Sequence, residues 1–61
     1  SLEYNLMFIH LALSQGEFFF ADETFNDIET LQLMDPMALE EYRKIYIAKR
    51  KNAIDVFEQA W

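Results

Sequence analysis

The C-terminal part of the sequence has the pattern of one long helix. Asp35 followed by Pro36 indicates a helix start, because an Asp side chain accepts hydrogen bonds from the first backbone N–H groups and proline fits the first helical position. Met34 and Leu39 are spaced to form a hydrophobic staple across that start. Neither glycine nor proline follows, so the helix is predicted to run from Pro36 to the end of the chain.

A broad apolar stripe follows this predicted helix. Its first row advances in steps of three and four residues, with one basic residue in a gap, and its second row repeats every seven residues. A stripe this wide is typical of a helix that packs on two neighbours. The first row is Leu39, Tyr42, Tyr46, Lys49, Ala53, Val56 and Ala60, the second is Ile47, Ile54 and Trp61, and Ile45 and Phe57 widen the stripe.

The first segment is also predicted to be helical, over residues 3–15. Leucine, methionine and alanine dominate it and its apolar positions do not alternate, which favours helix over strand. Gly16 then suits the left-handed position just past a helix C-terminus. The alternative is a β-hairpin with strands at 4–13 and 17–21, joined by a turn that ends at Gly16. The apolar face of the predicted helix carries Leu2, Leu6, Ile9 and Leu13, with Met7 and Phe8 beside them.

The middle segment is predicted to form a shorter helix from residue 23 to about residue 33. Phe25, Ile28 and Leu31 recur at three-residue steps, as one face of a helix requires. Asp22 or Thr24 supplies the N-cap, because both side chains can accept a hydrogen bond from the first helical turn.

Three consecutive aromatic residues precede this predicted helix. Phe18, Phe19 and Phe20 cannot all face one core, so we expect at least one ring to emerge toward a second chain or a groove. Aromatic side chains are enriched at the energetic centres of interfaces. The alternative is a connector that lies under the long helix with all three rings buried.

Length and composition complete the expected architecture. We expect residues 1–61 to form one small all-α domain of two or three helices, the last of them long. A chain this short buries only about 60% of the surface that its unfolded form exposes. No cysteine is present to add a disulfide, and 52% of the residues are hydrophobic. The sequence therefore predicts that the domain gains stability by associating with another chain.

The charges are segregated along the chain. All five basic residues lie between Arg43 and Lys51, whereas residues 1–42 carry nine carboxylates, and the net charge is −6. This segregation predicts that acidic and basic patches pair, within one molecule or between two. It argues against a nucleic-acid partner, because binding to phosphate backbones requires a dominant positive field.

Candidate catalytic and metal-binding residues are few. His10 and Ser14 are separated by four residues, so they can share one side of a helix, but no third catalytic group or glycine-rich oxyanion loop accompanies them. An acidic cluster at residues 22–29 lacks the alternating ligands, central glycine and closing glutamate of a calcium loop. We therefore expect no enzymatic activity, no metal and no cofactor.

The function predicted from these patterns is a protein-interaction module. The leading hypothesis is a homo-oligomer, specifically a dimer, that forms through the apolar stripe of the C-terminal helix. The alternative is an acidic decoy, inhibitor or assembly-chaperone-like adaptor that binds a basic surface of another protein. The interface residues expected from the sequence are Phe18, Phe19, Phe20, Tyr42, Tyr46, Ile47, Lys49, Ile54, Phe57 and Trp61.

The sequence also bears on location. No run approaches the ~20 apolar residues of a membrane span, and no basic segment precedes the apolar run at residues 6–13, so neither a membrane protein nor a signal peptide is expected. The absence of cysteine fits a reducing compartment, which favours a cytoplasmic location.

Overall fold

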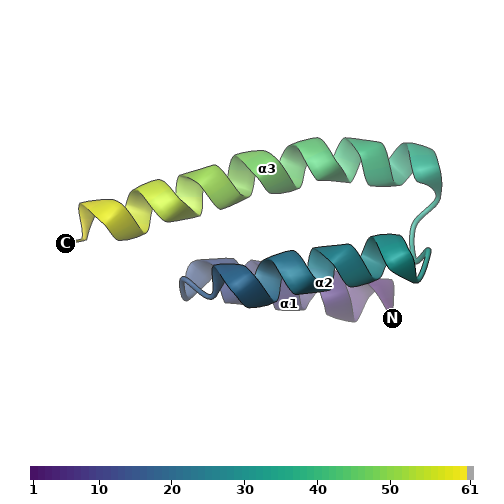
Figure 1. Ribbon diagram of the computed structural model, residues 1–61, viewed down its shortest axis with the longest axis horizontal. Coiled ribbons are helices and arrows are strands. Elements are labelled where there is room, and N and C mark those ends of the chain that lie inside the picture. The colour runs from purple at the N-terminus through teal and green to yellow at the C-terminus, as the bar shows by residue number, and fades with distance from the viewer. Residues whose placement is uncertain (61) are drawn as a thin grey trace.

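Three helices form the computed structural model, which describes residues 1–60 of the chain. They are α1 (Leu2–Ser14), α2 (Phe18–Thr30) and α3 (Pro36–Gln59). Helices α1 and α2 form an antiparallel hairpin, and α3 returns along one side of it (Figure 1). The predicted all-α fold with a long C-terminal helix is confirmed, and the β-hairpin alternative for the first segment is wrong.

The cap predicted for α3 is confirmed. Oδ1 of Asp35 accepts hydrogen bonds from the backbone N–H groups of Met37, at 3.1 Å, and Ala38, at 3.0 Å. Helix α1 has an equivalent cap, because the Ser1 hydroxyl oxygen accepts from the backbone N–H of Tyr4 at 3.2 Å. Each of these caps satisfies N–H groups that have no partner within the helix.

Helix α2 begins five residues earlier than predicted, at Phe18 instead of Glu23, and it ends at Thr30. No side chain caps its start, so packing rather than capping extends it. Ala21 is fully buried in the core, and the Phe18 ring packs edge-on against Phe57 with centroids 5.9 Å apart. Asp22, predicted as an N-cap, lies inside the helix, where its carboxylate faces α3.

Both turns of the bundle have the same helix-ending geometry. After α1, the N–H of Glu17 donates to the carbonyl of Ala12 and that of Gly16 donates to Leu13, as in a Schellman motif. Gly16 has a φ of 76°, so the left-handed position predicted for it is confirmed. Gln32 takes the equivalent position after α2 with a φ of 54°. Because this residue is not a glycine, nothing in the sequence indicated a left-handed position there.

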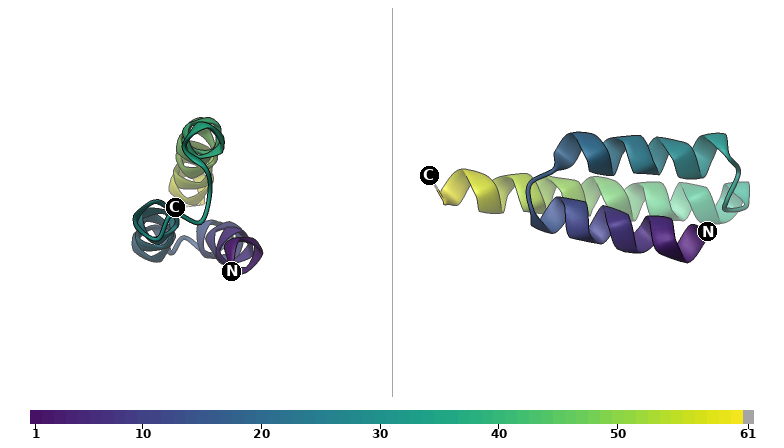
Figure 2. Two further views of the ribbon diagram at one scale, coloured as in Figure 1. Left: turned by 90° about the vertical axis from the view of Figure 1, so that its right-hand side faces the viewer. Right: turned by 90° about the horizontal axis from the view of Figure 1, so that it is seen from below.

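The core lies where the three helices meet. Helices α1 and α2 pack closely, whereas α3 stands farther from the hairpin and reaches it through long side chains. Viewed end-on, the helices lie at the corners of a triangle (Figure 2). The largest contribution from α3 is Tyr46, whose ring stacks on Phe25 at a centroid distance of 4.9 Å. The buried hydrophobic residues are Ile9, Ala12, Leu13, Ala21, Phe25, Ile28 and Tyr46.

The first prediction concerns Gly16. A β-carbon at this position would lie 2.9 Å from the Phe57 ring, and its φ is unfavourable for any residue with a side chain. We expect Gly16→Ala to lower the free energy of unfolding by about 1–2 kcal/mol, measured by urea denaturation. In the double variant Gly16→Ala/Phe57→Leu, the contact with the ring is removed but the unfavourable φ remains, so only part of the strain at residue 16 should be relieved. An unchanged stability of Gly16→Ala would contradict the geometry of this turn.

The second prediction uses the matching turn after α2. Gln32 is exposed and adopts a left-handed conformation that glycine adopts without strain. We expect Gln32→Gly to raise the free energy of unfolding by about 0.5–1 kcal/mol. In a domain of this size, that gain raises the thermal midpoint by roughly 2–8 °C. A lower midpoint for this variant would argue against a left-handed residue at the end of α2.

Candidate interaction surface

A hydrogen-bonded cluster joins α2 to α3. Arg50 binds the Asp22 carboxylate through two nitrogens, with Nε 2.8 Å from Oδ1 and one terminal nitrogen 2.9 Å from Oδ2. The Tyr46 hydroxyl donates to the same Oδ1. The hydrogen bonds from Arg50 hold the pKa of Asp22 below its ordinary value, while burial and the nearby carboxylate raise the pKa of Tyr46. This cluster fixes the side of α3 that faces α2.

A second ion pair lies toward the other end of α2. One terminal nitrogen of Arg43 is 2.9 Å from the Glu29 carboxylate, and the guanidinium lies 5.2 Å from the centre of the Phe25 ring. Arg50 is placed in the same way over Phe18, at 5.8 Å. Each arginine therefore combines an ion pair with contact on an aromatic face. The predicted pairing of the basic segment with the acidic half is confirmed within one molecule.

Much of the predicted interface is used inside the chain. Tyr46 is only 5% exposed, and Phe18, Tyr42 and Phe57 are partly buried against the hairpin or α3. Tyr42, Tyr46 and Phe57 lie on the stripe of α3 that faces the hairpin, and Phe18 lies on the hairpin itself, against Phe57. Within one chain a neighbouring helix is always present, so it reaches that stripe before a second molecule does.

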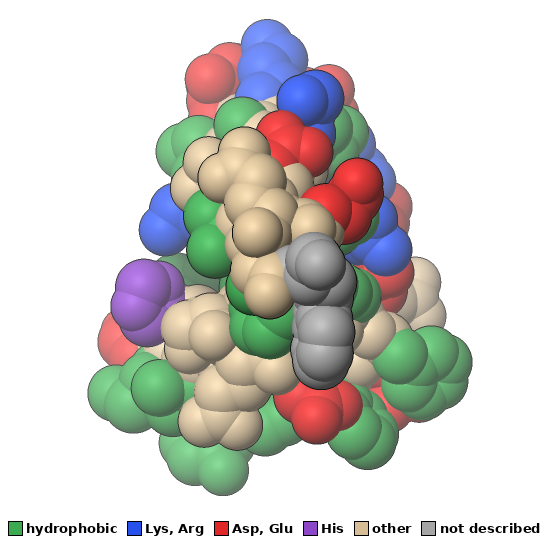
Figure 3. Space-filling view, turned by 90° about the vertical axis from the view of Figure 1, so that its left-hand side faces the viewer, with side chains coloured by type: hydrophobic (Ala, Val, Ile, Leu, Met, Phe, Trp, Pro, Cys, Tyr) green, Lys and Arg blue, Asp and Glu red, His purple; other side chains and the backbone are tan. Residues whose placement is uncertain are grey.

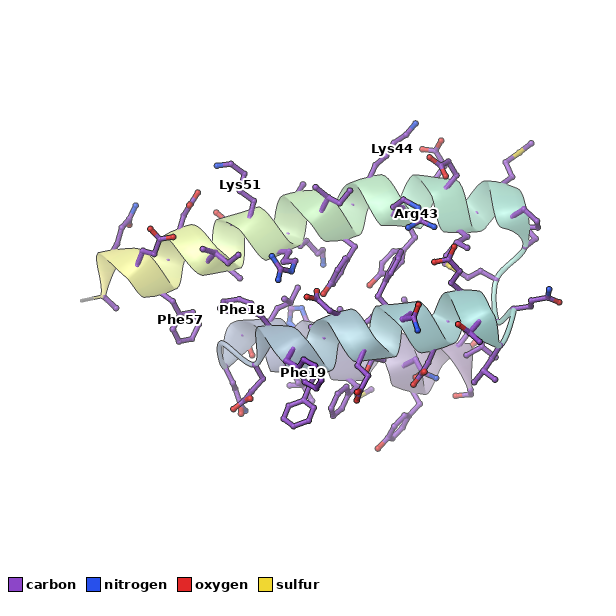
Figure 4. The ribbon with its side chains drawn as sticks, viewed as in Figure 1. Phe18, Phe19, Arg43, Lys44, Lys51 and Phe57 are labelled. Carbon is purple, nitrogen blue, oxygen red and sulfur yellow. The ribbon has the colours of Figure 1, made fainter. Side chains whose placement is uncertain are left out.

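Other predicted interface residues remain on the surface. Phe19 is 70% exposed and points away from α3, as Figure 4 shows. Ile47 is 60% exposed, Lys49 is exposed, Phe20 is about half exposed and Ile54 is partly buried. Trp61 lies outside the described residues.

An extensive exposed apolar surface lies on the hairpin, and of its residues only Phe20 was predicted from the sequence to lie at an interface. Four apolar residues of α1 are spaced by three, one and three positions, so they form a second stripe on the side away from buried Ile9. Met7 is 63% exposed and Leu11 is 49% exposed. The stripe consists of Tyr4, Met7, Phe8 and Leu11, and with Phe20 of α2 we call it the outer hairpin face.

A groove lies on this face between α1 and α2, near the turn that joins them. It has a volume of about 240 Å³, and its walls include Phe8 and Leu11 from α1 and Phe20 from α2. The other lining residues are Ala12, which is buried, Gln15 and Glu17. The groove therefore has an apolar lining with a carboxylate at its edge.

The charges around the hairpin all have one sign. Six of the eleven carboxylates precede residue 35 and no basic residue does, whereas the other five carboxylates are matched by all five basic residues. The net charge of −6 is therefore the charge of the α1–α2 hairpin, and the α3 segment is neutral. In Figure 3, Lys and Arg appear only in the upper part of the view, where they are mixed with Asp and Glu, whereas the lower part shows acidic and hydrophobic groups without Lys or Arg.

Two of the six hairpin carboxylates, Asp22 and Glu29, are neutralised by arginines of α3. The other four have no ion-pair partner within residues 1–60, and we call them the rim carboxylates. They lie on the exposed sides of α1, α2 and the loop between them. The rim carboxylates are Glu3, Glu17, Glu23 and Asp27.

A second groove, of about 340 Å³, lies between α1 and α3 and contains the possible catalytic pair. His10 and Ser14 line it on the α1 side, with Lys49 and Asn52 opposite. The Ser14 hydroxyl donates at 2.7 Å to the backbone carbonyl of Leu11, one turn earlier. Ser14 therefore uses its proton within its own helix, and this geometry gives His10 no activated nucleophile.

The acidic cluster of α2 does not form a metal site in the part of the chain that the structure describes. Asp22 and Glu29 face α3 and bind arginine, while Glu23 and Asp27 lie on exposed positions. No group of three or more possible ligands comes together in residues 1–60. The carboxylates instead divide into a pair that holds α3 and a pair that borders the outer hairpin face.

Comparison of the chain with protein-family models, with curated proteins and with solved structures found no match. Across the described residues, no helix combines the length and the hydrophobicity needed to cross a membrane.

The third prediction tests the cluster between α2 and α3. Because the pKa of Asp22 is lowered by folding, its contribution is present above the unfolded-state pKa and is lost as the pH falls through the folded-state value. We expect Asp22→Asn to cost about 1 kcal/mol of unfolding free energy near pH 7, an amount limited by solvent screening of this half-exposed pair.

The measurement is urea unfolding of both proteins from about pH 7 down to about pH 2, where the difference between them should shrink. Asp55→Asn is the matched control, since this carboxylate pairs with Lys51 inside α3 at 3.2 Å and should contribute only a few tenths of a kcal/mol. Equal losses from the two variants would show that the cluster does not hold α3 in place.

Proposed function

We propose that this chain is a non-enzymatic interaction module that binds another protein through its outer hairpin face. The observation that carries the proposal is the exposed apolar stripe of α1. Nine of the thirteen residues of this helix are apolar or aromatic, and they surround it on almost every side. A helix that is hydrophobic all round is normally buried, but α1 has cover only where it meets α2 and α3.

The size of the exposed patch supports a moderate affinity. The side chains of the outer hairpin face expose on the order of 500 Å², near the upper end for the largest patch on an ordinary monomer. At about 25 cal/mol per Å², full burial would contribute on the order of 10 kcal/mol to binding. The loss of translational and rotational freedom on association opposes it by roughly 4–15 kcal/mol. The apolar patch alone therefore favours reversible binding, and polar contacts at its edge decide which partner is preferred.

The chemistry of the polar groups supports a role without catalysis. The single histidine lies exposed beside a serine that already donates to its own helix backbone. Asp22, Tyr46 and Arg50, whose pKa values shift on folding, are bound to one another and hold α3 on α2. These groups serve the fold, so none of them is free to act as an acid, base or nucleophile.

Self-association through α3 is the competing proposal, and the sequence favours it. The hairpin occupies the centre of the α3 stripe, which leaves a second copy with the flanks of that helix. The large apolar residues that α3 exposes are Met37, at 81%, Ile47, at 60%, Val56, at 56%, and Ile45, at 50%. Ile47 lies on the flank opposite Ile45 and Val56. Two separated flanks offer less continuous apolar area than the outer hairpin face does.

The fourth prediction separates these two surfaces. Peptides are selected from a random displayed library against the whole protein, and we expect them to bind it with micromolar affinity. Their affinity for the variant Met7→Ser/Leu11→Ser should be at least about tenfold lower, because this variant lacks two apolar side chains of the face. The matched control is Ile47→Ser/Val56→Ser, which removes exposed apolar side chains of similar exposure from α3.

Light-scattering mass after size exclusion is measured on the same three proteins. We expect the parent protein to have a mass near 7.3 kDa and both variants to retain its helical circular dichroism. A dimer that dissociates only with the α3 variant would favour self-association through α3. Selected peptides that bind all three proteins equally would exclude the outer hairpin face as the binding surface.

A further inference from the structure

We infer that the outer hairpin face binds a cationic amphipathic helix of a partner protein. This inference rests on the proposed function and specifies the chemistry of the partner. It follows from the coincidence of an apolar groove between two helices with a surrounding charge that is entirely negative.

The shape of the face suits a helix. Helices α1 and α2 lie side by side and antiparallel (Figure 2). The groove between them lies toward the turn that joins them, with Phe8 and Leu11 on one side and Phe20 on the other. Thirteen residues at about 1.5 Å per residue make each helix roughly 20 Å long, which matches about four turns of a docked helix. Such a ligand would place apolar residues at i, i+3 or i+4, and i+7 against Phe8, Leu11 and Phe20. The flexible Met7 side chain can adapt to irregular packing beside them.

The charge of the face selects the polar side of that helix. Glu17 lines the groove, and Glu23 and Asp27 follow Phe20 at i+3 and i+7 on exposed positions of α2. None of the three has an ion-pair partner among the described residues. The hairpin has no basic side chain of its own to neutralise them. Lysine or arginine flanking the apolar stripe of the ligand would meet these carboxylates, whereas acidic residues there would be repelled.

A second copy of this chain is a poor occupant for the same reason. A two-fold contact between outer hairpin faces would oppose two sets of rim carboxylates with no intervening base. The basic groups of α3 do not relieve this repulsion. Arg43 and Arg50 are bound to α2, and Lys44 and Lys51 pair within α3, while Lys49 lines the other groove.

The fifth prediction uses two synthetic helical peptides of about 18 residues with the same leucine face, one with lysine at every polar position and one with glutamate. Binding to the full chain is followed by anisotropy of a neutral label. Amide chemical shifts locate the binding site. We expect the lysine peptide to bind at least about tenfold more tightly than the glutamate peptide at low salt, and its affinity should fall as the salt concentration rises. Its binding should change the chemical shifts of amides in α1 and α2.

Two charge variants refine the test. Glu23→Gln/Asp27→Asn removes two rim carboxylates and should weaken the lysine peptide by about three- to tenfold. Glu41→Gln/Glu58→Gln removes the same charge from exposed positions of α3, one of them paired with Lys44. We expect a change of less than about twofold, because these charges lie on another helix than the groove and solvent screens their effect over that distance. Met7→Ser/Leu11→Ser should weaken both peptides, since it removes the apolar contacts that they share.

The possible outcomes separate this inference from the proposed function. If both peptides bind equally and depend on Met7 and Leu11, the interaction module stands and the charge selection is wrong. If library-selected peptides bind this face but neither designed peptide does, the partner is not a cationic helix. If the lysine peptide binds independently of Met7 and Leu11, the chain acts as an acidic decoy and the apolar face is not the site.

Discussion

Docking of α3 on α2 is the interaction on which the rest of this structure depends. The Tyr46 ring stacks on Phe25, its hydroxyl donates to Asp22, and Arg50 binds the same carboxylate through two nitrogens. Because α3 stands away from the hairpin, these long side chains hold it in place, whereas α1 and α2 are held together by close packing of their backbones. The joint therefore combines aromatic stacking with a charge-assisted hydrogen-bond cluster.

The contact between α2 and α3 also determines which surface of the chain remains exposed. This contact uses the centre of the α3 stripe and both arginines. Helix α3 therefore has no apolar surface left that is as continuous as the outer hairpin face, and its two arginines are already paired. The hairpin keeps its other side exposed, and four carboxylates remain there without a basic partner in residues 1–60. An apolar face with an acidic border is thus a consequence of how the chain satisfies its own core, and it is the reason to propose a cationic partner.

Local chemistry explains which parts of the fold were predictable. The start of α3 depends on Asp35 and Pro36, and the end of α1 depends on Gly16, so adjacent residues were enough to predict both. The start of α2 depends on Ala21 and Phe18 meeting distant residues, and the capping signals nearby pointed to a later start. The outer stripe of α1 was detectable from the spacing of Tyr4, Met7, Phe8 and Leu11, but a sequence pattern does not say which of two apolar faces will be covered.

By itself, the sequence determined that the chain is helical, where its last helix begins and that its charges are divided between two parts. Those properties follow from capping groups, helical periodicity and composition, which act over a few residues. Only the tertiary structure decided that Asp22 and Glu29 bind α3, that Tyr46 is buried within the chain, and that the exposed apolar face belongs to the hairpin. The physical reason is competition: helices of one chain bury the faces that fit best together, and only the remainder is available to a partner.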